Sequence, residues 1–309
     1  MKLRIILNGK KAGDEMLRQA ITSMRASHEI QVRVTFEAGD VARLVDEAIA
    51  EGCRRLVAAG GDGTLNELVS ALMDHDKDKR CELAILPLGT ANDFATAAQV
   101  PSDFEAALRL AAEGEIYGVD VIRANERYVV NIASGGFGAQ VTANTPVALK
   151  HFLGGGAYTL SGLVQALNFK PYDGEFTIHG EASKQQLLVG AVCNGRQAGG
   201  GQELAPDAYI NDGLMDLVAL HQFPIEALAQ VIAELQSPKA ENQYVKYYRD
   251  TQASWRSNPP MPINLDGEPI AESRVDFELK VGAIAMVLPK DCPLLQPGSK
   301  PIKRVSNRC

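Results

Sequence analysis

Hydrophobic positions in the first part of the chain alternate between two periods. Short apolar runs have the length and composition of buried strands at Leu3–Leu7, Ile30–Val34, Leu56–Ala59 and Leu83–Leu86. Apolar residues at helical spacing mark helices around Leu17–Met24, Val41–Ile49, Thr64–Leu72 and Phe104–Ala112. Strands that alternate with helices of this length predict βαβ units and therefore a mostly parallel sheet.

The pattern changes after Asp120. The stretch VDVIRANERYVVNIAS predicts two strands joined by a turn near Ala124–Glu126. Further strands are expected at Glu175–His179, Leu187–Val192, Leu214–Leu220, Ala253–Arg256, Ile263–Leu265, Val275–Leu279 and Ala283–Leu288, with helices near Tyr158–Leu167 and Ile225–Leu235. This part of the sequence predicts a mostly antiparallel β domain.

The predicted fold class is therefore an α/β amino-terminal domain followed by a mostly antiparallel β domain. We expect the first domain to cover residues 1–118 and to be rejoined by 289–309, and the second to cover 119–288. Two domains usually place a small-molecule site in the cleft between them. In a parallel sheet, such a site lies beyond the carboxyl ends of the strands.

Composition narrows the class of protein. The 309 residues include 46% apolar and 22% charged residues, which is typical of a globular protein with a substantial core. A net charge of −7 argues against a general nucleic-acid binder. The chain starts without a signal-peptide pattern, and its apolar runs are far shorter than the roughly 18 residues of a membrane span. Five scattered cysteines without CxxC spacing predict reduced thiols in a cytoplasmic protein.

A glycine-rich loop follows the third predicted strand. Gly60, Gly61 and Gly63 leave a bare backbone just before a helix, and N–H groups at a helix start favour an anion such as phosphate. A tight turn without a ligand is the alternative. The P-loop pattern is absent, and the dinucleotide fingerprint fails because Asn66 replaces its third glycine. The carboxylate of Asp62 would repel a phosphate unless a divalent cation lay between them, which favours a nucleotide with Mg²⁺.

A second polar loop follows the fourth predicted strand. The stretch PLGTANDFA carries Gly89, Thr90, Asn92 and Asp93. Parallel strands bring such loops close together, so these groups are candidates for fixing a nucleotide and its metal. In the alternative interpretation, Thr90 or Asn92 only caps a short helix.

These two loops carry a resemblance to a known family. GGDGTLNE (Gly60–Glu67) with LPLGTANDFA (Leu86–Ala95) closely resembles the diacylglycerol kinase catalytic domain that is shared with sphingosine kinases. Similar GGDG loops occur in NAD kinases and phosphofructokinases, whereas the second motif is more selective. Further similar stretches are NIASGGFGAQVT (Asn131–Thr142), NGRQAGGGQELAPDAYINDGLMDL (Asn194–Leu217) and NLDGEP (Asn264–Pro269). The chain looks most similar to bacterial lipid kinases of the YegS type.

The resemblance implies a nucleotide domain like that of NAD kinase, a carboxyl-terminal β-sandwich, and phosphate transfer from ATP to a lipid with Mg²⁺. It implies Glu268 as the general base, and Tyr209, Asp212 and Leu214 as a second metal site built from one carboxylate and two backbone carbonyls. Many relatives have Asn-Pro after the first strand, whereas this chain has Asn8-Gly9. The nucleotide-binding residues expected from the loops and the resemblance together are Thr35, Gly60, Gly61, Asp62, Gly63, Thr64, Leu65, Asn66, Glu67 and Thr90.

The chemistry of these residues agrees with the resemblance but leaves alternatives open. A carboxylate within hydrogen-bond reach of a lipid hydroxyl accepts its proton during transfer, yet Asp266-Gly267 before Glu268 is also a common hairpin turn. The oxygen ligands around Asp212 suit Mg²⁺ or Ca²⁺, but Asn-Asp-Gly is also an ordinary turn. Asp216 is expected to point away along the next strand.

The predicted function is a lipid kinase whose acceptor is diacylglycerol or phosphatidylglycerol, with a sphingoid base not excluded. The alternatives are a kinase of a soluble acceptor, like NAD kinase, and a nucleotide-sensing module without turnover. A lipid kinase must reach a bilayer, so we expect a cytoplasmic protein with reversible peripheral membrane association. Candidate contacts are the basic tail with Lys300, Lys303, Arg304 and Arg308, or Phe152–Gly156; the tail is alternatively a solvated end. The sequence does not reveal the oligomeric state.

Overall fold

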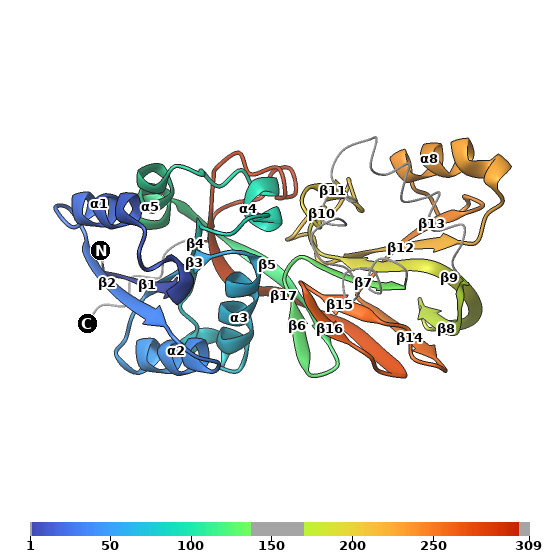
Figure 1. The fold of residues 1–309 in the computed structure, drawn as a ribbon, viewed down its shortest axis with the longest axis horizontal. Helices are drawn as coiled ribbons and strands as arrows, with labels where there is room; N and C mark the ends of the chain where they lie inside the picture. The colour runs from blue at the N-terminus through green and yellow to red at the C-terminus, as the bar shows by residue number, and fades with distance from the viewer. Residues whose placement is uncertain (1, 137–169, 303–309) are drawn as a thin grey trace. The chain divides into compact units, whose positions relative to one another are not determined.

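The chain forms two compact units. A computed structural model describes residues 2–136 and 170–302 (Figure 1). The first unit takes in residues of Met1–Val121, Ile210–Asp212 and Val281–Cys309, and the second takes in residues of Ile122–Tyr209 and Gly213–Lys280. Compactness alone does not define a domain that folds by itself, so the domain limits at residues 118 and 289 stay a prediction.

A parallel sheet forms the centre of the first unit. Its strands lie in the order β17-β4-β3-β1-β2, and all four neighbouring pairs are parallel. The bounds are β1 Lys2–Asn8, β2 Glu29–Thr35, β3 Arg55–Gly60, β4 Glu82–Pro87 and β17 Arg274–Leu288. Every residue of β3 is buried, as expected for a strand with neighbours on both sides and helices on both faces.

Helices cover both faces of this sheet. Figure 1 shows α1 and α5 on one face, and α2 and α3 on the other. The face under α1 and α5 holds a core in which Leu3 and Ile5 of β1 meet Leu17 of α1 and Leu108 of α5. Asp14 and Asp103 start α1 and α5 by accepting a backbone N–H in the first turn. The helix bounds are η1 Gly9–Lys11, α1 Glu15–Met24, α2 Asp40–Ala50, α3 Asp62–Met73, η2 Lys77–Lys79, α4 Asp93–Ala97 and α5 Phe104–Glu113.

The second unit is built from antiparallel strands. The carboxyl-terminal half of β9 lies between β7 and β12, and its amino-terminal half pairs with β8. The remaining neighbours follow in the order β16-β15-β7 on one side and β8-β14-β17 on the other, with β13 beside β12. Strand β5 Glu115–Ala124 begins in the first unit and ends in the second. The bounds of the other strands are β6 Arg127–Val129, β7 Ile132–Gly136, β8 Tyr172–Ile178, β9 Glu181–Cys193, β10 Gln197–Ala198, β11 Gln202–Glu203, β12 Met215–His221, β13 Val245–Asp250, β14 Gln252–Ser257, β15 Ile263–Leu265 and β16 Glu268–Ile270.

Two apolar cores stabilise this β-sandwich. The larger core includes Trp255, Phe277 and Ile263, with Phe176 and Tyr248 packed against it. The smaller core includes Val218 and Val231, and it packs β12 against η3 Ile225–Ala227 and α8 Leu228–Gln236. The alternation of these two residue sets along β12 follows from the period of two in a strand.

The predicted fold class is confirmed, with corrections to single elements. The two strands expected at Val275–Leu279 and Ala283–Leu288 are one strand, β17, which passes through Gly282 with a φ of +53°. Strand β13 was not predicted, because its sequence VKYYRD lacks a clear apolar alternation. The helix expected at Tyr158–Leu167 lies outside the described residues. Within those residues, no helix is both long and apolar enough to cross a membrane.

Candidate functional site

The parallel register of the first unit gathers the predicted nucleotide residues at one edge of the sheet. Asn8 at the end of β1 pairs with Thr35 at the end of β2, and Gly60 at the end of β3 pairs with Pro87 at the end of β4. The loops that follow these strands therefore emerge side by side. This is the edge at which ligands bind in open parallel sheets.

The first glycine loop is closely packed against its own helix. A side-chain carbon at Gly60 would overlap the side chain of Thr64, which is buried and whose hydroxyl accepts a hydrogen bond from Asn8 Nδ2 at 3.3 Å. Helix α3 follows with Gly61 as its N-cap residue and without a side-chain cap. The first turn of α3 thus offers backbone N–H groups that a ligand can use.

The individual residues of this loop differ in exposure. Gly63 and Glu67 are exposed, and Gly61, Asp62 and Asn66 are partly exposed. Leu65 is buried, and its N–H bonds to the Gly61 carbonyl at 3.1 Å within the helix. A nucleotide contact by Leu65 would therefore involve the backbone alone, whereas the glycines present open backbone directly.

The second loop touches the first through two glycines. A side-chain carbon at Gly89 would lie 2.5 Å from the Cα of Gly61, so only glycine fits at this approach. The Asn92 side chain closes the loop, because its Oδ1 accepts the Gly89 N–H and its Nδ2 donates to the Gly89 carbonyl, both at 2.9 Å. Asn92 itself has a φ of +51°, and Thr90 between these residues is exposed.

Asp62 joins the two loops. Its carboxylate accepts the backbone N–H groups of Asp93 and Phe94, each at 3.1 Å, at the start of α4. Phe94 is fully buried, so these hydrogen bonds hold the second loop against a rigid core. The expectation that Asp62 faces a metal stays a prediction. Its observed contacts are hydrogen bonds that hold the backbone of the second loop.

Thr35 ends strand β2, and the loop that follows it is held by another carboxylate. The Thr35 hydroxyl accepts the N–H of Gly9 at 3.4 Å. After it, Asp40 accepts the N–H groups of Phe36 and Glu37 at 2.6 and 3.1 Å, and it pairs with Arg43 at 2.6 Å. The hydrogen bond from Arg43 and those from the two backbone N–H groups lower the pKa of Asp40 to about 2. Sequence reasoning missed Asp40, although an acidic residue at a helix start was a visible signal.

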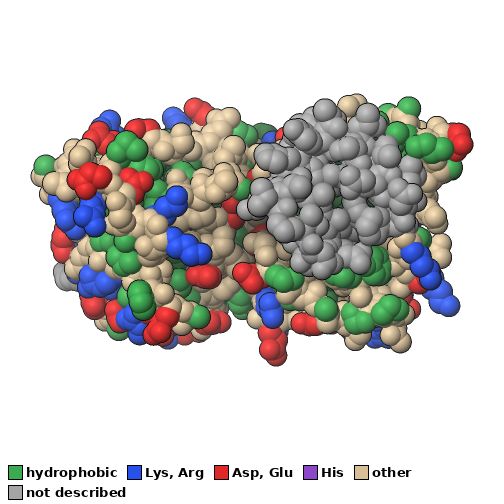
Figure 2. Space-filling view, in the orientation of Figure 1, with side chains coloured by type: hydrophobic (Ala, Val, Ile, Leu, Met, Phe, Trp, Pro, Cys, Tyr) green, Lys and Arg blue, Asp and Glu red, His purple; other side chains and the backbone are tan. Residues whose placement is uncertain are grey.

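Side chains of both charges lie on the surface of the first unit. Figure 2 shows Lys and Arg interspersed with Asp and Glu on the visible face of the first unit. Backbone N–H groups at the helix start are therefore the clearest feature of this unit that favours an anion.

Glu268 lies in the second unit, at the start of β16. It is exposed, and within the described part of the chain no hydrogen bond or ion pair engages its carboxylate. It follows the two-residue turn Asp266–Gly267, which joins β15 to β16. A carboxylate that is open to solvent is available to take a proton from a bound hydroxyl.

Tyr209, Asp212 and Leu214 lie in the irregular segment that precedes β12. All three are partly exposed, and Arg196 stacks its guanidinium 5.1 Å from the centre of the Tyr209 ring. Asp216 is fully buried and accepts a hydrogen bond from the Tyr247 hydroxyl. The described residues contain no cluster of three acidic, histidine or cysteine side chains that suits a metal. A metal in this segment would rely on backbone carbonyls together with Asp212, and such an oxygen set suits Mg²⁺ or Ca²⁺.

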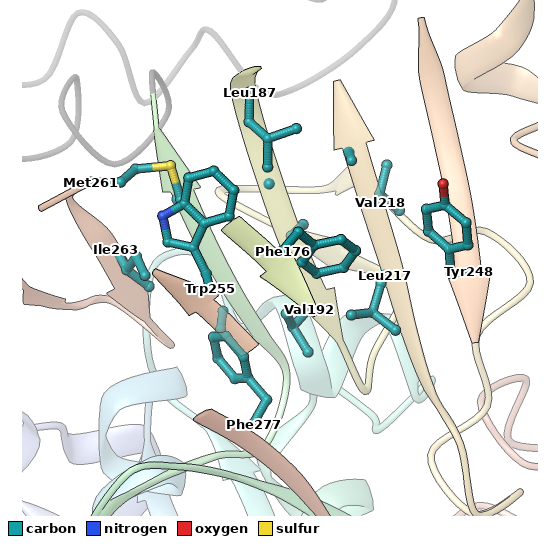
Figure 3. Close-up of a pocket in the computed structure, with 15 residues that line it drawn as sticks. Phe176, Leu187, Val192, Leu217, Val218, Tyr248, Trp255, Met261, Ile263 and Phe277 are labelled. Carbon is teal, nitrogen blue, oxygen red and sulfur yellow. The ribbon is translucent and has the colours of Figure 1, made fainter. Parts of the chain in front are cut away.

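An apolar pocket lies inside the β-sandwich of the second unit. Strands β7, β8, β9, β12, β13, β14, β15 and β17 contribute its lining (Figure 3). Of the lining residues, Tyr248 and Trp255 carry a polar side-chain atom, and the Trp255 indole donates to the Ser257 hydroxyl at 3.1 Å. Sequence reasoning had instead considered Phe152–Gly156 for lipid entry, which lie outside the described residues, as do 303–309 of the basic tail.

Comparison with known proteins covers both units. Residues 2–124 match the family model of the diacylglycerol kinase catalytic domain, and 131–288 match that of the YegS C-terminal NAD kinase beta sandwich-like domain. A probable lipid kinase YegS-like protein of Shewanella frigidimarina is 47% identical over 295 residues, which are 95% of this chain and 96% of the relative. A second one, from Chromohalobacter salexigens, is 42% identical over 94% of both chains.

A solved structure has the same fold. The crystal structure of a putative diacylglycerol kinase from Bacillus anthracis matches with a TM-score of 0.78 at 24% identity, over 94% of this chain and 96% of that one. Sequence similarity to the curated relatives extends over both units. The chain therefore belongs to the family of YegS-like lipid kinases.

Proposed function

We propose that this protein transfers the γ-phosphate of ATP to a free hydroxyl of a membrane lipid. The observation that carries the proposal is the contact of Gly61 with Gly89. It brings two bare backbone loops together at the carboxyl edge of the sheet, beside an uncapped helix start. Such a surface accepts a polyphosphate, and the family supplies the lipid kinase chemistry.

This geometry supports the nucleotide contacts that we propose. The N–H groups at the start of α3 and in the glycine loops are assigned to the phosphates, and the hydroxyls of Thr35 and Thr90 to the rest of the nucleotide. A divalent cation bound with ATP neutralises phosphate charge during transfer. Mg²⁺ is the metal we expect there.

Glu268 is assigned to the acceptor. A lipid hydroxyl is a poor nucleophile, so it needs a group that takes its proton as the new O–P bond forms and ADP leaves. The exposed carboxylate of Glu268 has the chemistry for that step. The roles of Tyr209, Asp212 and Leu214 as a second metal site remain part of the proposal, with Mg²⁺ preferred and Ca²⁺ as the alternative.

The acceptor class is supported by the relatives' names and by the apolar pocket. Diacylglycerol and phosphatidylglycerol both carry a free hydroxyl next to acyl chains. The lining with Phe176, Leu187 and Leu217 offers the apolar contact that an acyl chain favours. A protein that acts on such a lipid contacts the bilayer reversibly, which vesicle flotation measures directly.

The experiment is transfer of labelled γ-phosphate from ATP into a total bacterial lipid extract, with a parallel panel of soluble acceptors that includes NAD. We expect a labelled lipid with wild type and none with Glu268→Gln, and its mobility identifies the acceptor. Label in a soluble acceptor instead would move the assignment to an NAD-kinase-like reaction. Nucleotide binding without any transfer, across Mg²⁺, Ca²⁺ and detergent conditions, would indicate a sensing module.

A further inference from the structure

One carboxylate in the second unit binds three consecutive backbone N–H groups. Asp266 accepts from Val130 at 2.6 Å, from Asn131 at 3.1 Å and from Ile132 at 2.8 Å. Its own N–H donates to the Ile132 carbonyl at 3.2 Å. Hydrogen bonds to an ionised acceptor are stronger than neutral ones, so this Asp266 clamp, formed with Val130–Ile132, is a firm connection between distant parts of the chain.

The clamp acts on the turn that carries Glu268. Leu265 pairs with Glu268 across a two-residue turn, and both turn residues, Asp266 and Gly267, have positive φ values of +49° and +104°. This is the pattern of a type I′ hairpin turn. Asn264 Oδ1 accepts the Gly267 N–H at 2.6 Å and closes the turn. Strand β16 is the outer strand of its sheet and pairs with β15 on one side only. The turn and the Asp266 clamp therefore add to the support of its first residue, Glu268.

The other side of the clamp is itself fixed. Asn194 is fully buried, and its Nδ2 donates to the Val130 carbonyl at 2.8 Å. The N–H groups of Asn194 and Gly195 donate to the Asn131 carbonyl at 2.9 and 3.0 Å. Asn131 Nδ2 in turn donates to the Gln197 carbonyl at 2.8 Å. Val130 and Asn131 are thus held by buried amides, and Asp266 ties the Glu268 turn to this support.

We propose that Asp266 is the positioning residue of the general base. The clamp fixes the backbone two residues before Glu268, and thereby restricts where the Glu268 carboxylate meets the acceptor hydroxyl. Asp266 is not itself the base in this assignment, because its oxygens are engaged by the three N–H groups. The inference rests on the proposed role of Glu268. A small misplacement of a reacting group is sufficient to lower a rate by about 100-fold.

The test uses Asp266→Asn and Asp266→Gly. Asn and Gly both favour the positive φ of a type I′ turn, so these variants keep the turn and remove the carboxylate. Asp250→Asn is a matched control, because Asp250 also accepts three backbone N–H groups, from His179, Thr251 and Gln252 at 2.7, 2.6 and 3.3 Å. Asp250 ends strand β13, which is separated from β16 by β12, β9, β7 and β15.

For Asp266→Asn we expect kcat for lipid phosphorylation to fall between about 10- and 100-fold, with the KM and Kd for ATP unchanged. Asp250→Asn should keep kcat within about twofold of wild type even where its unfolding temperature drops similarly. Hydrogen exchange of the Val130–Ile132 amides should accelerate in Asp266→Asn and not in Asp250→Asn. An unchanged kcat, an equal loss of kcat in the control, or unchanged exchange at these amides would each overturn the assignment.

The proposed function and this inference fail differently. Lack of lipid phosphorylation by wild type, or full activity of Glu268→Gln, would overturn the role of Glu268 and this assignment with it. Normal wild-type activity that Glu268→Gln abolishes and Asp266→Asn leaves intact would overturn the positioning role alone.

Discussion

Asp62 holds the backbone of Phe94 across 32 positions of sequence: its Oδ1 accepts the Phe94 N–H at 3.1 Å. Its second oxygen accepts the neighbouring N–H of Asp93 at the same distance. The carboxylate of the first glycine motif therefore organises the second motif. The two loops form one structural unit, and a change in either is expected to affect both.

Replacing Asp62 by Asn should loosen this connection, because the amide keeps one acceptor and loses the charge. We expect the free energy of unfolding to fall by about 1–2 kcal/mol and ATP binding to weaken by roughly tenfold. Titration calorimetry and denaturant unfolding measure the two effects. Asp74→Asn is the control, since Asp74 is exposed and follows the opposite end of the same helix; equal behaviour of both variants would remove the special role of Asp62.

Replacing Gly89 by Ala should separate the loops. The added carbon would lie 2.5 Å from the Cα of Gly61 and 2.6 Å from Asn92 Oδ1, so the backbone must shift. Overpacking of this kind destabilises by about 1–3 kcal/mol. We expect a lower unfolding temperature together with weaker ATP binding, and a variant with wild-type stability would contradict the close approach of the loops.

Replacing Gly63 by Ala should raise the stability of the fold, whereas Gly89→Ala lowers it. A carbon at Gly63 meets no atom within 4 Å, and the residue lies in the first turn of α3. Alanine in a helix is more stable than glycine by up to about 1 kcal/mol. ATP binding should nevertheless weaken at least tenfold if a phosphate docks against this bare backbone. A stabilised variant with unchanged affinity would show that Gly63 is not a phosphate contact.

The lowered pKa of Asp40 predicts that part of the stability of the fold is lost in acid. Its pKa of about 2 in the folded state lies below the ordinary value of 3.8, mainly through the hydrogen bond from Arg43. A lowered pKa stabilises the fold above pH 4, and this contribution is lost as the pH falls from about 4 to 2. Denaturant unfolding between pH 2 and 6 should show a shallower decline for Asp40→Asn than for wild type. Parallel curves would contradict the lowered pKa.

Filling the apolar pocket should affect the acceptor alone. Gly190 lines the pocket, and a side-chain carbon there would meet Leu187 at an ordinary distance of 3.5 Å. Gly190→Leu should lower kcat/KM for a long-chain diacylglycerol by roughly tenfold and spare the Kd for ATP. A short-chain diacylglycerol is the internal control. Equal activity of the variant with both chain lengths would argue that acyl chains do not enter this pocket.

Periodicity was sufficient to predict strands β1–β4 and helices α1, α2, α3 and α5 of the first unit, because each of these carries its own apolar pattern. It failed in the second unit for strand Val245–Asp250, whose apolar and polar residues do not alternate clearly. It also failed at Gly282, which suggested a break inside one long strand. The motifs indicated which loops bear the candidate chemistry. They did not reveal that Asp62 bonds Phe94 or that Asp266 bonds Val130–Ile132, because these partners are far apart in sequence and meet only after the sheets have formed.

The last part of β17 has a consequence for how the protein is made. Ile284, Met286 and Leu288 are fully buried in the first unit, and Met286 pairs with Leu83 of β4. At 5–20 residues per second, a ribosome reaches this strand roughly 10–30 seconds after it has finished residue 121. During that interval the nascent chain presents β4 as an open strand edge, a surface that invites wrong pairing. The glycine loops that follow β3 and β4 therefore reach their final support only after residue 288 has been made.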